Sequence, residues 1–379
     1  MLFRSKLFFV PAALAMFAFG CSSDGTGDDD DDDDVAAEAD AGNFPVEPPF
    51  DAPPMEWTWI DVPGSECMND TPTGMGVNVN PTSSKLMIYL EGGGACFNAF
   101  TCTGVAHQNG FGSSDFDGII RDGGSSGVFN RADGDNPFAD WNMIFVPYCT
   151  GDIFSGSNPD GFGGRNQVGY DNMGFYTDLL VQEFPHVNHV VLTGSSAGGF
   201  GASYNYDRVA TAFGTTKVTL LDDSGPALGD KYMTPCLQEN VRDIWNLDAT
   251  LPQDCTECFG EGGLSKITDY IATKWTDRNF GVITSTRDGV IRLFLGWGFP
   301  SCSNPTVPMP EADFAEGVAE MRDVLLAPYD NFSVYTIESG LHVWLLENPL
   351  GATEVSGVKL TDWIRGQLAD ESSWDDVIP

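Results

Sequence analysis

The chain has 379 residues, of which 42% are hydrophobic, and its formal net charge at pH 7 is −37. That length allows one large hydrophobic core or two ordinary ones. The negative charge excludes nucleic-acid binding through a basic face, and after residue 20 no apolar stretch is long enough to cross a bilayer as a helix.

The first 21 residues have the pattern of a signal peptide for export. Two basic residues precede an apolar stretch at residues 7–19, and Cys21 follows. The pattern predicts a lipoprotein-type signal in which Cys21 is lipidated, and two acyl chains on one residue anchor a protein stably. Ordinary signal cleavage is the alternative, because Ala18 stands where leucine is usual. We expect an exported protein, anchored by lipid at the outer membrane or cell surface of a Gram-negative bacterium.

Residues 22–56 are acidic and rich in proline. They include seven consecutive aspartates at residues 28–34 and supply 13 of the 55 acidic groups, so the rest of the chain remains acidic. Such a segment cannot bury enough apolar surface to fold, and its like charges extend it. The composition predicts a disordered tether, with a calcium-binding acidic tract as the alternative.

The cysteine count fits export as well. If Cys21 carries lipid, eight of the nine cysteines remain, and an even number in an exported protein indicates disulfides. The sequence leaves their pairing open. Cys255 and Cys258 have the spacing of a metal or redox site, but with only four histidines and no second such pair we expect a structural disulfide role. The eight are Cys67, Cys96, Cys102, Cys149, Cys236, Cys255, Cys258 and Cys302.

Residues 57–379 contain no linker and no repeat, and we interpret them as one domain. Six short apolar runs, each ending in turn residues, are typical of buried strands. They begin "KLMIYL", "NMIFV", "HVVLTG", "KVTLLDD", "FGVITS" and "FSVYTI". Helix-like stretches lie between them and after the last, including residues 171–184, 311–328 and 357–370. The alternation predicts an α/β fold with a mainly parallel central sheet flanked by helices, and functional groups at the carboxyl ends of its strands.

Three glycines directly follow the first of these strands, in "YLEGGGAC" at residues 89–96. Backbone N–H groups in such a loop can stabilise an oxyanion in acyl-transfer enzymes. A flexible turn is the alternative, and the choice depends on whether a nucleophile follows along the chain.

The stretch "GSSAG" at residues 194–198 fits the pattern G-x-S-x-G, with Ser196 at its centre. The pattern places a serine on a strained turn between a strand and a helix, where side chains two positions away would clash. "HVVLT" supplies the strand and "GGFGASYNYDRVA" the helix. A phosphate-binding loop would need a lysine beside its last glycine, and none is near. We therefore expect a nucleophile rather than a plain tight turn.

A serine nucleophile needs a base, and in the α/β-hydrolase fold the chain order is serine, acid, histidine. His342 is the one histidine after Ser196, and it follows the last predicted strand. The other three lie before Ser196: His107, expected in a loop, and His186 and His189, expected at the surface.

The acid is less determined. Asp288 ends the strand before that of the histidine and is our choice. Asp222 and Asp223, one strand earlier, are the alternatives. With this triad present, we favour an oxyanion hole formed by the backbone of Gly93, Gly94 and Ala197, the last being a member of the serine turn. We expect neither a metal nor a cofactor.

Four segments together resemble the pectin acetylesterase and Notum carboxylesterase family. They are "LEGGGAC", "NPFADWNMIFVPYCTGDIFSG", "VLTGSSAGGFGA" and "SGLH", in family order from about residue 86 to 342. The resemblance implies an α/β-hydrolase-like fold, with Ser196, Asp288 and His342 as the triad. One departure is that Gly94 and Ala95 stand where the family usually has a bulky aromatic residue, which changes the acyl pocket.

These observations predict a secreted serine carboxylesterase that deacetylates a polysaccharide such as pectin through an acyl-enzyme. One alternative is a lipase or deacylase for longer acyl esters, since small residues at the glycine loop would open a deeper pocket. Another is a non-catalytic surface-binding relative. The expected partners are an acylated substrate and, through Cys21, a membrane.

Overall fold

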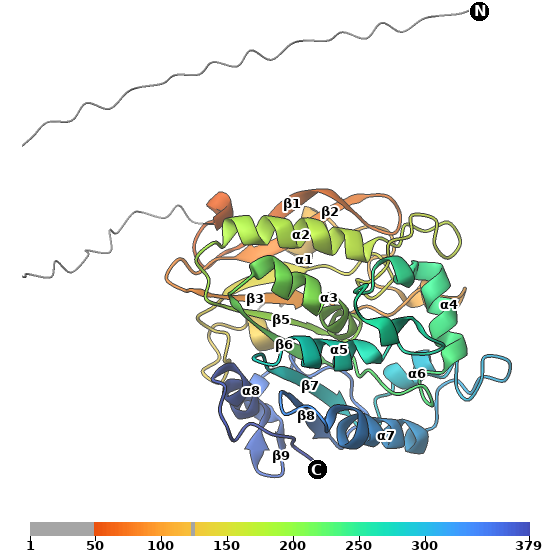
Figure 1. The fold of residues 1–379 in the computed structure, drawn as a ribbon. Coiled ribbons are helices and arrows are strands. Elements are labelled where there is room, and N and C mark those ends of the chain that lie inside the picture. The colour runs from red at the N-terminus through yellow and green to blue at the C-terminus, as the bar shows by residue number, and fades with distance from the viewer. Residues whose placement is uncertain (1–48, 123–125) are drawn as a thin grey trace, which may run out of the picture. The chain divides into compact units, whose positions relative to one another are not determined.

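An eight-stranded sheet lies at the centre of the molecule (Figure 1). The computed structural model describes residues 49–122 and 126–379, and these all belong to one compact unit. The strands of this sheet are β1 (Trp57–Glu66), β2 (Pro72–Asn78), β3 (Lys85–Leu90), β4 (Asn142–Val146), β5 (His189–Ser195), β6 (Lys217–Asp223), β7 (Phe280–Ser285) and β8 (Phe332–Ile337). A small separate sheet consists of β9 (Glu354–Val355) and β10 (Val358–Lys359).

The strand order is β1-β2-β4-β3-β5-β6-β7-β8. The six strands from β4 to β8 in this order are parallel, while β2 pairs antiparallel with both β1 and β4. The chain leaves β3 to one side for β4 and returns to its other side for β5. Loops at such a reversal diverge and leave a crevice at the carboxyl ends of the strands. The predicted mainly parallel sheet is confirmed, and the six predicted strands are β3 to β8.

The two antiparallel strands β1 and β2 were not among the predicted elements. β1 contains Pro63 and Gly64, and its register with β2 shifts between Asp61 and Glu66. Most of its residues are partly or fully exposed, so the continuous apolar run that marks a buried strand is missing.

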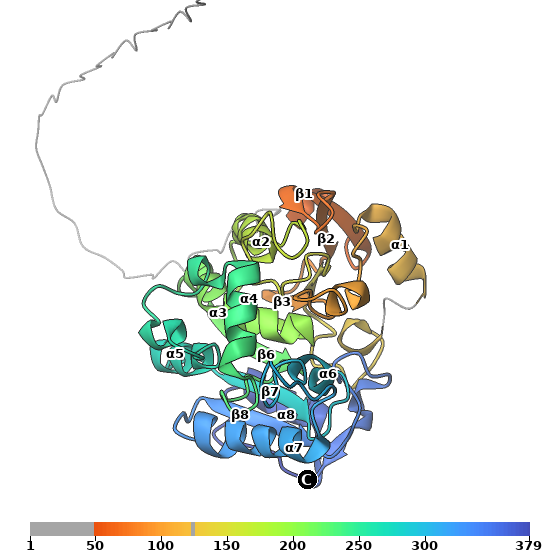
Figure 2. The ribbon, with the colours of Figure 1, turned by 90° about the vertical axis from the view of Figure 1, so that its right-hand side faces the viewer.

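Helices cover both faces of the sheet, and Figure 2 shows α1 and α2 on opposite sides of the strands. Side chains of α2, α3, α4, α5 and α7 share one core with alternate residues of the central strands, such as Ile88 and Leu192. The other core contains side chains of α1 and α8 with the intervening residues, such as Tyr89 and Val191. The helices are α1 (Ser113–Asp122), α2 (Gly169–Glu183), α3 (Ala197–Phe213), α4 (Pro235–Trp245), α5 (Lys266–Lys274), α6 (Ile291–Leu295), α7 (Glu311–Glu320) and α8 (Leu360–Leu368).

The segment before β1 is described only from residue 49. Residues 49–56, which the sequence places in the tether, lie against the folded unit: Ala52 is buried and the ring of Phe50 contacts that of Phe184. The predicted signal peptide with Cys21, and the rest of the tether, lie outside the described residues. No helix in the described chain is long and apolar enough to cross a membrane.

All eight cysteines of the folded part pair with one another, as predicted. The disulfides are Cys67–Cys149, Cys96–Cys102, Cys236–Cys302 and Cys255–Cys258. The close pair Cys255–Cys258 is thus a disulfide beside α5.

Candidate active site

Ser196 lies at the junction between β5 and α3, with backbone angles φ 58° and ψ −119°. A non-glycine residue in this region stores about 1–3 kcal/mol of strain and persists only where its surroundings enforce it. Glycines on both sides are required: a Cβ at Gly198 would overlap the Leu90 carbonyl oxygen, and one at Gly194 would lie 2.5 Å from the same atom. The predicted strand–turn–helix context of Ser196 is therefore present.

Asp288 and His342 are joined by a hydrogen bond of 2.6 Å between Oδ2 of the carboxylate and Nδ1 of the ring. The Asp288 side chain is fully buried, and that of His342 is 17% exposed. The second carboxylate oxygen, Oδ1, accepts the N–H groups of Val290 and Ile291 at 2.8 and 2.9 Å. This carboxylate is therefore held at the start of α6 and fixes the orientation of the ring.

Asp222 and Asp223, the alternative acids, bind other groups. The Asp222 carboxylate accepts hydrogen bonds from the Ser203 hydroxyl and the Gly225 amide. The Asp223 carboxylate accepts amide N–H groups of the chain just after His342, and no hydrogen bond joins it to the His342 ring within the described residues.

The loops that carry Ser196 and His342 meet at the end of β6. The Ser196 amide donates to the Asp223 carbonyl oxygen at 2.7 Å, and the Trp344 amide donates to the Asp223 carboxylate. In the described chain no hydrogen bond joins the Ser196 hydroxyl to the His342 ring. Such bonds are often long in substrate-free enzymes and shorten when substrate binds.

The glycine loop after β3 lies against the serine turn. Gly92 approaches so closely that a Cβ on it would lie 3.0 Å from the Ser196 Cβ atom. Among the hydrogen bonds of the described residues, none uses the amide N–H groups of Gly93, Gly94 or Ala197 as donors. Unpaired amides beside a serine hydroxyl are the donors that an oxyanion hole requires.

Two adjoining apolar cavities extend from Ser196. The first is lined by Gly94, Ser196 and Ala197, and it shares five wall residues with the second. Their shared wall consists of Ala95, Ile153, Phe200, Phe294 and Leu295, and the second cavity adds Phe97, Tyr204, Met233, Leu237, Val241 and Trp245. The sequence did not single out these side chains, apart from Ala95, because they match no catalytic motif.

The polar atoms in this wall are bound elsewhere. The Trp245 indole N–H donates to the Cys96 carbonyl at 3.0 Å, and the Tyr204 hydroxyl donates to the Leu264 carbonyl at 3.2 Å. The cavities therefore present hydrocarbon and aromatic surface to a bound group.

A buried carboxylate, Asp152, holds the backbone of this wall. It accepts hydrogen bonds from the Thr150 hydroxyl and the amides of Phe154 and Gly169. Burial raises the pKa of Asp152 to about 6, although these hydrogen bonds lower it. Ile153 and Phe154 have φ values of 51° and 59°. A β-branched residue in that region is a genuine outlier, so this wall of the cavity is a constrained part of the fold.

His107 lies in a loop, as expected, whereas His189 does not lie at the surface. The His107 ring binds Glu91 beside the glycine loop, with 3.1 Å between Nε2 and Oε1. Burial lowers the pKa of His107, but the hydrogen bond and charge of Glu91 and the charge of Asp115 together raise it more, so the net pKa is raised. His189 was expected at the surface, but β5 is a central strand and the side chain is buried, 2.9 Å from the Thr219 hydroxyl.

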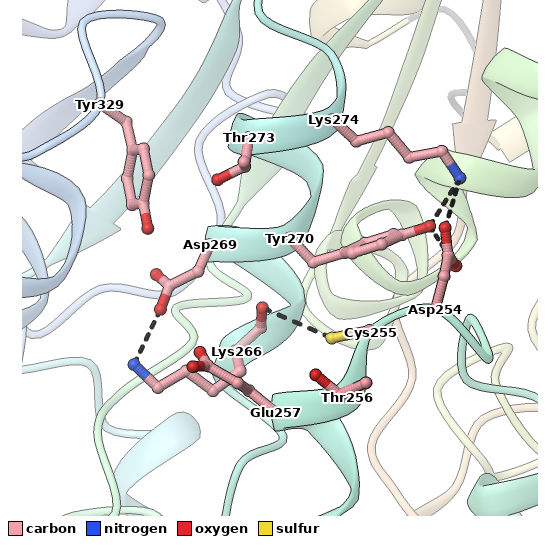
Figure 3. Close-up of a pocket in the computed structure, with 10 residues that line it drawn as sticks. All are labelled: Asp254, Cys255, Thr256, Glu257, Lys266, Asp269, Tyr270, Thr273, Lys274 and Tyr329. Carbon is pink, nitrogen blue, oxygen red and sulfur yellow. Dashed lines mark hydrogen bonds and ion pairs between the residues drawn. The ribbon is translucent and has the colours of Figure 1, made fainter.

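A separate surface pocket lies beside α5 (Figure 3). Its charged groups largely satisfy one another: Lys266 pairs with Asp269 at 2.8 Å, and Lys274 and the Tyr270 hydroxyl both bind Asp254. None of its lining residues belongs to the predicted site.

The sequence profile of the pectinacetylesterase family matches residues 56–272, more than half of the chain. This match ends before Asp288 and His342, so the pairing of these two residues rests on the structure alone.

Relatives with sequence similarity include palmitoleoyl-protein carboxylesterases. Notum2 of Xenopus laevis is 29% identical over 225 residues, covering 52% of this chain and 44% of the relative. NOTUM of Schmidtea mediterranea is 37% identical over 132 residues, covering 34% and 24%. The chain thus spans less than half the length of these curated relatives.

The solved structure of the Wnt deacylase Notum from Drosophila matches with a TM-score of 0.60 and 17% identity. The match covers 84% of this chain and 95% of that one. At this identity the likeness shows the fold, and it confirms the predicted α/β-hydrolase-like architecture.

Proposed function

Because the chain belongs to the pectinacetylesterase family, we propose that it is a serine carboxylesterase with Ser196, His342 and Asp288 as its triad. One observation carries the proposal: the buried Asp288 carboxylate binds Nδ1 of His342 at 2.6 Å. That bond fixes the tautomer in which Nε2 is free to accept a proton.

In the proposed reaction the Ser196 hydroxyl attacks the ester carbonyl while Nε2 of His342 takes its proton. The amides of Gly93, Gly94 and Ala197 stabilise the oxyanion, and Asp288 stabilises the imidazolium. The imidazolium then protonates the departing alcohol, which leaves an acyl group on Ser196. Water, deprotonated by His342, attacks this acyl group, and the carboxylic acid leaves as the proton returns to Ser196.

The cavities beside Ser196 favour an acyl group longer than acetyl. An acetyl methyl group would fill the first cavity only in part and leave the second, with Phe97, Met233 and Trp245, unused. Burial of a methylene group contributes about 0.8 kcal/mol, which is roughly fourfold in an equilibrium or rate constant.

A series of p-nitrophenyl esters from acetate to dodecanoate tests this proposal. We expect kcat/KM to rise roughly fourfold for each methylene that enters the cavities, and then to level off or fall. Phe294→Ala, which changes the shared wall, should move the optimum to longer chains. No hydrolysis of any ester would refute the esterase proposal, and a monotonic fall from acetate would refute the preference for longer chains.

Acetyl esters of polysaccharides remain a second candidate substrate class, favoured by the family description. The acidic chain, with a net charge of −37, would repel a polyanion such as pectin more than a neutral acetylated polysaccharide. Acetate release from acetylated xylan but not from acetylated pectin would support this candidate in its neutral form.

Export is also part of the proposal. Four disulfides are typical of proteins that fold in an oxidising compartment. Lipid anchoring through Cys21 is a separate prediction from the sequence, and metabolic labelling with a fatty-acid analogue tests it.

A further inference from the structure

Asp223 ends β6, which lies in the sheet between β5, the strand of the serine turn, and β7. The Asp223 side chain is fully buried. A carboxylate in such a place is costly unless hydrogen bonds satisfy it, so its partners indicate what it does.

Those partners come from both sides of the site. Oδ2 accepts the Ser195 hydroxyl at 2.7 Å, the Trp344 amide at 2.9 Å and the Leu345 amide at 3.0 Å. Oδ1 accepts the Ser224 hydroxyl at 3.0 Å. The backbone carbonyl of Asp223 accepts the Ser196 amide. One residue therefore binds the serine turn and the loop that carries His342.

The loop held in this way is strained. Val343, directly after His342, has φ 62°, a conformation that a β-branched side chain rarely adopts. Its amide donates to the Ser224 hydroxyl at 3.2 Å, and that hydroxyl itself donates to Asp223. Strain of about 1–3 kcal/mol persists only where neighbouring groups enforce it, and here these are Ser224 and Asp223.

The same carboxylate is also linked to the strand that precedes the glycine loop. The Ser195 hydroxyl accepts a hydrogen bond from the Tyr89 hydroxyl at 2.9 Å, and Tyr89 lies on β3 just before that loop. The serine turn, the histidine loop and the base of the glycine loop thus converge on one buried side chain.

We propose that Asp223 is a positioning residue, whose carboxylate fixes residues 342–345 against the serine turn and so aligns His342 with Ser196. The consequence for catalysis rests on the proposed function, while the fixing of residues 342–345 by the Asp223 carboxylate does not. An asparagine at this position would turn an NH2 group toward N–H donors and lose the charge that strengthens these bonds.

The test compares full-length Asp223→Asn with Asp222→Asn. Asp222 is a buried carboxylate next in sequence, whose bonds go to Ser203 and Gly225, so it is a matched control. A misplacement of about 1 Å costs roughly 100-fold in rate. We expect kcat to fall about 100-fold in Asp223→Asn with KM within about threefold, as for an interaction that acts mainly on the transition state. Asp222→Asn should keep kcat within about threefold of the wild type.

Hydrogen–deuterium exchange of the peptide containing residues 342–346 gives a readout that needs no activity. Exchange there should be faster in Asp223→Asn and unchanged in Asp222→Asn. Unchanged exchange in Asp223→Asn, or an equal fall of kcat in both variants, would overturn the proposal. If Asp223→Asn does not fold, Ser224→Ala replaces it, with faster exchange and a roughly tenfold lower kcat expected. If the wild-type protein hydrolyses no ester but the exchange pattern is as expected, the esterase proposal is refuted. The fixing of residues 342–345 by Asp223 is still supported in that case.

Discussion

Asp288 uses its two carboxylate oxygens for two different tasks. Oδ1 binds the backbone at the start of α6, and Oδ2 binds His342. Because the carboxylate is held from the backbone side, the ring cannot rotate without breaking the bond at Nδ1. Asp222 and Asp223 are the alternative acids in the sequence. Their carboxylates bind other groups, and neither is hydrogen-bonded to the His342 ring in the described residues.

Asp288→Asn should lower kcat by about 100-fold to 10,000-fold, because an amide at this position favours the wrong tautomer of the histidine. The measurement is kcat with the best p-nitrophenyl ester, beside a thermal unfolding curve that shows the variant is folded. A folded variant within tenfold of the wild type would argue against Asp288 as the acid.

At the scale of elements, the serine turn depends on the close packing of β3, β5 and α3. Leu90 of β3 is paired with Gly194 of β5, and its carbonyl oxygen also lies where a Cβ of Gly198 would be. The sequence predicted a glycine requirement at this turn from its motif. It could not identify Leu90 as the obstacle, because the obstacle belongs to a strand more than 100 residues away.

Gly198→Ala should destabilise the protein by about 1–3 kcal/mol, since the added methyl group forces the packed backbone of β3 and α3 apart. Gly260→Ala is the control, because no atom lies within 4 Å of a Cβ there and its φ is ordinary. Urea unfolding measures both variants. A free energy of unfolding for Gly198→Ala equal to that of Gly260→Ala would show that the turn tolerates a side chain.

For the whole molecule, the six parallel strands of the sheet could be predicted from the sequence, because buried strands are continuous apolar runs that end in turn residues. The pairing of Asp288 with His342 could be predicted from the chain order serine, acid, histidine. β1 could not, since Pro63, Gly64 and partial exposure remove that pattern. β2 could not, because Gly74 and Gly76 interrupt its buried residues and leave no continuous apolar run. The apolar cavities could not either. They join side chains such as Phe97, Trp245 and Phe294 from distant segments, and such residues are indistinguishable in sequence from ordinary core.

Stability should depend on pH through buried carboxylates such as Asp222. Burial raises its pKa from an ordinary 3.8 to about 7. Between these values the folded protein binds a proton that the unfolded chain does not, so this group's contribution to stability is greatest at low pH and is lost as pH rises toward 7. Asp222→Asn removes this contribution. The melting temperature of the variant minus that of the wild type should therefore increase from pH 4.5 to 7.5, and a constant or decreasing difference would contradict the assignment.

Whether Ser196 is the nucleophile of an esterase can be decided by measuring the turnover of Ser196→Ala. We expect a loss of at least about a thousandfold in the hydrolysis of p-nitrophenyl butyrate, with a melting temperature close to that of the wild type. A folded Ser196→Ala variant that hydrolyses the ester at nearly the wild-type rate would contradict it.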